Sequence, residues 1–345
     1  MYFPLDLLTT LGTWERRGQQ EGARDHFFHT FNNLFLGLLI LGHLFEGRSS
    51  SKPPDRYIRR AATPSRLLPW EVIWVLTCLF HDPGYITEKI WVTISFAYGF
   101  PNQLPSGQPI PEQIREQLNN AWDVYHSQIG EEIASLFQRL TRGDTWTPPR
   151  FSKAETASFR GALREVYFNG TRVGHSLQSG IHLINYCASD KTPPPGGYDP
   201  EAALTACEIA ALSMMFHDQH CRNVMREAKV RPLTFEQLPY SAVLMFVDAL
   251  QDDRRDITKN SFRAHGVLTD MNIRSEGNHD VAEASVCLQE VPLKWWPSKI
   301  EEYEDVMRWI NAKSKTQFVI DYQTRAWGQQ ARKTHRPGAR RRRHA

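Results

Sequence analysis

Histidine and aspartate side chains recur where apolar segments of this chain end, and there they could bind a cation. His81 and Asp82 directly follow the apolar run at 70–80, and Pro83 and Gly84 come next and break a helix. An adjacent imidazole and carboxylate can bind one cation, and a mixed set of nitrogen and oxygen ligands suits first-row transition metals. The dipeptide therefore predicts a metal ligand pair at a helix end.

Asp248 is a second acidic residue in an apolar setting. It has six apolar residues before it and two after it in the segment SAVLMFVDAL. A carboxylate there must be neutralised, paired with a cation or bound to a metal, because burying it alone costs several kcal/mol. A structural ion pair and a helix-end position are the alternatives to a metal ligand.

Further candidate ligands are histidines on other apolar segments. His26 and His29 share one helix face, and Asn32 and Asn33 extend this polar strip, which is typical of a cavity or a hydrogen-bond network. For each histidine alone, a satisfied core residue is the alternative.

Two candidates lie later in the chain. His217 follows Met214, Met215 and Phe216 at the apolar end of its segment. His175 lies among small residues that would let a neighbouring helix approach closely, and His182, two turns further on, is a rival for its role. The small residues are Gly174, Ser176, Ser179 and Gly180.

These side chains need helices to position them, and the apolar periodicity predicts a mainly α chain. Helices are expected at 26–46, 70–80, 111–141, about 174–189, 200–220 and 235–252. Beyond residue 256, the segments 284–291 and 316–323 have strand character and flank an amphipathic helix near 298–312. We therefore expect a helical body followed by a small α/β C-terminal segment.

In chain order, the candidate ligands are His29, His81, Asp82, His175, His217 and Asp248. Over roughly residues 24–255, this ordered set resembles the HD-domain superfamily of metal-dependent phosphohydrolases. There the first helix carries a His that Ser or Thr often follows, as in His29-Thr30, and a paired His and Asp name the superfamily. The additional histidines resemble the branch that holds two metal ions.

The resemblance implies an HD-domain-like helical bundle with a role for each residue. One divalent transition metal ion (Mn, Fe, Co, Ni or Zn) would be held by His29, His81, Asp82 and Asp248. A second ion would be held by His175 and His217, with Asp82 bridging both ions as a catalytic residue. Arg24 and Lys89 are the cations expected to meet a phosphate, with a surface charge as the alternative for each.

The implied function is that of an enzyme, an HD-type metal-dependent phosphohydrolase. It would cleave a phosphoester in a nucleotide or another phosphorylated small molecule with a metal-bound hydroxide, since metal ions lower the pKa of bound water. The alternative is a non-catalytic or regulatory ligand-binding protein on the same scaffold. Tyr85 stands where the cyclic-dinucleotide branch carries Lys, which disfavours that substrate class.

The expected organisation along the chain has four parts. They are an N-terminal extension at 1–23, the HD-like domain at 24–256, the small α/β segment at 257–325 and a disordered basic tail at 326–345.

The distribution of charge restricts the role of nucleic acid as a partner. The 345 residues carry a net charge of +3, but the last fifteen contribute seven Lys and Arg and no acid, which leaves −4 for residues 1–330. We expect only non-specific, salt-sensitive nucleic-acid binding, and only through this tail.

Composition and local patterns also suggest where the protein resides. The five cysteines are scattered without a CxxC pair and suggest reduced core thiols, and the N-terminal residues lack the features of a signal peptide. The apolar run at 34–45 is shorter than the roughly 20 residues of a membrane span. We therefore expect a cytoplasmic protein that does not enter a membrane.

The choice of His29 over His26 predicts a difference between two variants. His29→Ala should lower bound metal and phosphoester hydrolysis much more than His26→Ala, because only His29 is assigned as a ligand. Metal analysis of the purified variants and a hydrolysis assay measure both effects. The reverse order would identify His26 as the ligand.

Overall fold

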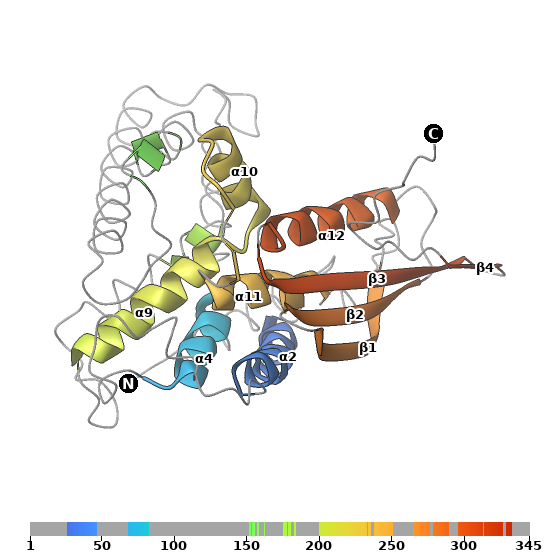
Figure 1. Ribbon diagram of the computed structural model, residues 1–345, viewed down its shortest axis with the longest axis horizontal. Helices are drawn as coiled ribbons and strands as arrows, with labels where there is room; N and C mark the ends of the chain where they lie inside the picture. The colour runs from blue at the N-terminus through green and yellow to red at the C-terminus, as the bar shows by residue number, and fades with distance from the viewer. Residues whose placement is uncertain are drawn as a thin grey trace, which may run out of the picture. The chain divides into compact units, whose positions relative to one another are not determined.

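The computed structural model describes the helices, strands and turns that are coloured in Figure 1. The described residues are 26–46, 68–82, 152, 154–155, 157–158, 162, 175–177, 179–180, 183, 200–232, 234–235, 238–250, 265–276, 279–289, 296–312, 314–326 and 329–332. They form a mainly α protein with a small sheet, as the sequence predicts. The expected helix at 111–141 lies outside them.

The chain divides into two compact units. Residues 1–54 and 232–345 form the first unit, and residues 55–231 form the second unit. The first unit thus combines segments from the two ends of the chain. The predicted domain boundaries stay a prediction.

The second unit contains α4 (Trp70–Phe80), α9 (Pro200–Met215) and α10 (Gln219–Glu227). Helix α4 ends at Phe80, as expected, because Pro83 disfavours helical backbone at the residue before it. Helix α9 is buried from Ala206 onward and packs against α4. It ends at Met215, earlier than predicted, because a turn separates it from α10.

The described part of the 174–189 segment is helical at 175–177, 179–180 and 183. Its small residues permit the close approach that the sequence predicts. A Cβ added to Gly180 would lie 2.5 Å from Met215 Cγ and 3.0 Å from the Ala211 carbonyl oxygen, so this helix runs against α9. Ser176 Oγ also donates to the Met215 carbonyl at 3.2 Å.

The first unit contains α2 (His26–Glu46) and α11 (Pro239–Leu250) beside the C-terminal sheet. Helix α11 is buried at each of its residues except Asp248, and it packs against α2, α12 (Trp296–Ile310) and β1 (His265–Glu276). Aromatic rings connect these elements to the sheet: Phe318 lies 5.1 Å from Phe246 and 5.8 Å from Phe235, between ring centroids. These contacts form the core of the unit.

The sheet has the strand order β1-β2-β3-β4, with β2 at His279–Gln289, β3 at Thr316–Ala326 and β4 at Gln329–Arg332. Strands β2 and β3 are parallel and are connected through α12, whereas β1 and β4 pair antiparallel with their neighbours. Alternate residues of β3 are buried (Thr316, Phe318, Ile320 and Tyr322), whereas β2 buries Val281 and Cys287 in addition to Ala282, Ala284 and Val286. The predicted strand–helix–strand arrangement is confirmed.

Strands β1 and β4 and helix α10 are additional to the prediction. Glu276 pairs with His279, so the two residues Gly277 and Asn278 connect β1 to β2, a sequence typical of a tight hairpin turn. Thr269 is the extra residue of a bulge in β1, and its hydroxyl donates to the Ser285 carbonyl at 3.0 Å.

The start of the segment expected to be a disordered tail is instead part of the sheet. Strand β3 extends to Ala326, and β4 pairs with it so that Ala326 faces Gln329. Gly328 is one of the two connecting residues, and a glycine there favours a hairpin. Residues 333–345 lie outside the described residues.

Two glycine substitutions should have opposite effects on stability. Gly180→Ala should lower the free energy of unfolding by about 1–3 kcal/mol, because the added methyl group overlaps Met215. Gly42→Ala on α2 should raise it by up to about 1 kcal/mol, since its Cβ would meet nothing within 4 Å and Ala favours a helix. Urea unfolding measures both, and equal midpoints for the two variants would contradict the packing described here.

Candidate metal centre

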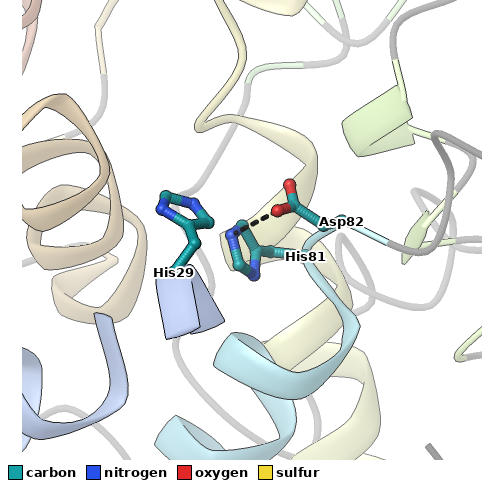
Figure 2. A group of neighbouring side chains, drawn as sticks. All are labelled: His29, His81 and Asp82. Carbon is teal, nitrogen blue, oxygen red and sulfur yellow. Dashed lines mark ion pairs between the residues drawn. The ribbon is translucent and has the colours of Figure 1, made fainter. Parts of the chain in front are cut away.

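The end of α4 buries an imidazole and a carboxylate next to each other. His81 is 0% exposed and Asp82 is 1% exposed. His81 Nε2 lies 3.3 Å from Asp82 Oδ2, the ion pair drawn as a dashed line in Figure 2, which also labels His29 of the first unit. The position predicted from the Pro-Gly stop is therefore a buried one.

The protonation of His81 follows from its other nitrogen. His81 Nδ1 lies 2.7 Å from the Cys78 carbonyl oxygen, which can only accept, so Nδ1 carries a proton. In a neutral imidazole, Nε2 would then present a lone pair to the Asp82 carboxylate, and the two would repel. A proton shared with the carboxyl group or a metal ion at Nε2 removes this repulsion, and a His whose Nδ1 donates to a carbonyl is typical of metal sites.

His217 is held in the same way at the turn that follows α9. Its Nδ1 lies 2.5 Å from the Met214 carbonyl oxygen, three residues earlier, so this nitrogen also donates. The buried Arg222 of α10 donates through Nη1 to the His217 carbonyl. The imidazole and the backbone of His217 are thus both fixed.

His175 completes the cluster of the second unit. Its Nε2 lies 3.8 Å from Asp82 Oδ1, and its ring centroid lies 5.3 Å from that of His217. The ligand atoms of Asp82, His175 and His217 all lie within 4.8 Å of one another, close enough for one ion. The two Asp82 oxygens face different imidazoles, Oδ2 toward His81 and Oδ1 toward His175.

Serine hydroxyls hold the helix of His175 against this cluster. Ser179 Oγ donates to the His81 carbonyl at 2.8 Å, which connects the helix to the end of α4. Ser176 Oγ lies within hydrogen-bond distance of both the Met215 carbonyl, at 3.2 Å, and Asp218 Oδ2, at 3.4 Å. Both serines are fully buried.

A second His/Asp pair lies in the first unit, with His29 buried and Asp248 partly exposed. His29 Nε2 lies 2.8 Å from Asp248 Oδ1 and 3.1 Å from Asn33 Nδ2. Asn33 Nδ2 also lies 3.5 Å from Asp248 Oδ1, so the polar strip on α2 does join a hydrogen-bond network, as predicted. Asp248 is the one residue of α11 that is not buried, which agrees with its polar partners.

These two clusters carry side chains that can bind metal ions. Each combines imidazole nitrogen with carboxylate oxygen, and the second unit offers His81, Asp82, His175 and His217 together. Four of the six predicted ligands thus meet in the second unit, and His29 meets Asp248 in the first unit.

Other predicted residues lie outside the described part of the chain. These are Arg24 and Lys89 and the rival ligand His182, and of His26 only the backbone is described. Sequence reasoning missed Asp218, whose Oδ2 lies 3.9 Å from His175 Nδ1. The available signal was its position directly after His217, which repeats the His-Asp order of residues 81 and 82.

The cysteines differ in part from the expectation of reduced thiols. Cys78, Cys221 and Cys287 are free and buried, but Cys207 is disulfide-bonded, and scattered spacing could not reveal which sulfur atoms approach in the fold. Burial raises the pKa of the Cys221 thiol, as does the nearby Asp218 charge. A raised pKa favours the neutral thiol form of Cys221.

Comparisons with known proteins assign no family to the chain. No protein-family model matches it, and no curated protein does. Its mainly helical structure and buried His/Asp clusters are compatible with an HD domain. Among the described helices, none has both the length and the apolar character needed to cross a membrane.

Metal binding at the cluster of the second unit should stabilise the folded protein. With Zn²⁺ or Mn²⁺ at 100 times its dissociation constant, the gain is about 2.7 kcal/mol, or roughly 4 °C in Tm for a chain of this length. His217→Ala should abolish most of this rise, whereas His43→Ala, at an exposed position of α2, should keep it. An equal rise in both variants, measured by calorimetry, would exclude His217 as a ligand.

Proposed function

We propose that this protein is a metal-dependent phosphohydrolase of the HD type, with two divalent transition metal ions. The observation that carries the proposal is the buried Asp82 carboxylate, whose two oxygens face His81 Nε2 at 3.3 Å and His175 Nε2 at 3.8 Å. A carboxylate that presents one oxygen to each of two imidazoles suits a ligand shared by two ions.

The ligand assignment combines the two clusters. His81, Asp82, His175 and His217 supply the ligands of the second unit, and the order of residues along the chain supports adding His29 and Asp248 to the same centre. The ions would supply a hydroxide at neutral pH and positive charge for the phosphoryl oxygens. The excess of acidic over basic residues in 1–330 makes this charge important for an anionic substrate.

The chain's own groups have two tasks in this proposal. The carbonyl groups of Cys78 and Met214 accept from the Nδ1 atoms of His81 and His217 and keep the other ring nitrogens available for metal. Arg24 and Lys89 are proposed to bind the phosphate of the substrate, a phosphorylated small molecule. We propose the cytoplasm as the location.

Replacement of Asp82 tests the proposal. Asp82→Ala should abolish bound metal and lower hydrolysis by at least about 100-fold, because it removes the shared ligand. Asp82→Asn, of nearly the same volume, repeats the test if the Ala variant misfolds, and Asp270→Ala, at an exposed position of β1, is the matched control. Metal analysis and a screen of phosphorylated metabolites with added metal provide the measurements.

The same experiment separates the competing functions. Full metal content and full hydrolysis in the folded Asp82 variants would disprove the assignment. Bound metal in the wild type without hydrolysis of any phosphoester tested would instead favour a regulatory ligand-binding protein.

A further inference from the structure

His175 is held differently from the two other histidines of the second unit. His81 and His217 donate from Nδ1 to the carbonyl group three residues earlier in the chain. At His175, by contrast, Nδ1 faces the Asp218 carboxylate, with 3.9 Å between Nδ1 and Oδ2. The opposite nitrogen, Nε2, faces Asp82 Oδ1 at 3.8 Å. The imidazole therefore lies between two carboxylates, one of which belongs to the candidate metal centre.

Asp218 is itself held from two sides. Ser176, the neighbour of His175, places its hydroxyl 3.4 Å from Asp218 Oδ2. The Asp218 carbonyl accepts from the backbone N–H of Arg222 at 3.2 Å in the first turn of α10. The carboxylate is largely buried, with 16% of its side chain exposed. Its position is thus set by the turn that also carries His217.

We propose that Asp218 is a positioning residue of the metal centre, which orients His175 with Nδ1 protonated and Nε2 directed at the metal. This inference rests on the metal centre of the proposed function. Histidine ligands commonly donate their second ring nitrogen to a carboxylate or carbonyl group, which fixes the tautomer and strengthens the metal bond. Asp218 would supply for His175 what Cys78 and Met214 supply for His81 and His217.

The arrangement also couples two ligands through one short turn. His217 and Asp218 are consecutive, so the turn between α9 and α10 presents one ligand directly and orients another. Arg222 fixes the same turn through its bond to the His217 carbonyl. A shift of this turn would therefore displace His217 and release His175 together.

Substitutions of Asp218 test this role, and they are chosen to keep a residue that favours the start of a helix at this position. Serine and asparagine are both favourable residues before a helix, so Asp218→Ser and Asp218→Asn should leave the start of α10 intact. In Asp218→Ser, we expect 10–100-fold weaker Co²⁺ binding in a spectroscopic titration, with altered visible absorption of the bound ion. Asp218→Asn should lose less, because its amide oxygen can still accept from Nδ1. The Tm of the metal-free protein should stay at the wild-type value.

The outcomes distinguish this inference from the function on which it rests. Wild-type Co²⁺ affinity and absorption in Asp218→Ser would overturn the positioning role alone. A lowered Tm of the metal-free variant with unchanged Co²⁺ affinity would assign Asp218 a structural role instead. Failure of the wild-type protein to bind Co²⁺, Zn²⁺ or Mn²⁺ would disprove the proposed function and this inference with it.

Discussion

The central interaction of the second unit's cluster is the approach of His81 Nε2 to the Asp82 carboxylate, 3.3 Å apart. Both groups are buried, and the Cys78 carbonyl commits Nδ1 of His81 to donate, so a proton or a metal ion must lie between Nε2 and the carboxylate. A proton on Nε2 would make His81 an imidazolium and give a buried ion pair with Asp82. In such a pair, the attraction between the charges often only balances the free-energy cost of removing both from water. In the proposed centre, one divalent cation would lie at His81 and Asp82, and a second would lie at Asp82, His175 and His217.

The surrounding fold keeps this cluster rigid through close backbone approach. Gly180, Ser176 and Ser179 bring the helix of His175 against α9 and the end of α4. The two serine hydroxyls donate to carbonyl groups there. In the turn after α9, the His217 side chain donates to the Met214 carbonyl, and Arg222 of α10 donates to the His217 carbonyl. A neighbouring segment therefore restrains the backbone that carries each histidine. Ligands of a metal centre need to be held in place in this way.

Much of this could be predicted from the sequence, for identifiable reasons. The end of α4 follows from Pro83, and the close packing near His175 follows from the small residues around it. Strand β1 was missed although Gly277-Asn278 indicates a hairpin, because its alternation is weak. The His-Asp order at 217 and 218 pointed to Asp218, but its approach to His175 and the Cys207 disulfide depend on the fold and not on a local pattern.

The most direct test of the metal centre is a crystal structure of the protein with Mn²⁺, with anomalous scattering recorded to locate the ions. The account predicts anomalous peaks within bonding distance of Asp82, with His175 and His217 as ligands and the Nδ1 atoms of His81 and His217 still on their carbonyl partners. A structure at saturating Mn²⁺ with no peak beside Asp82, and with His81 and Asp82 paired directly, would contradict it.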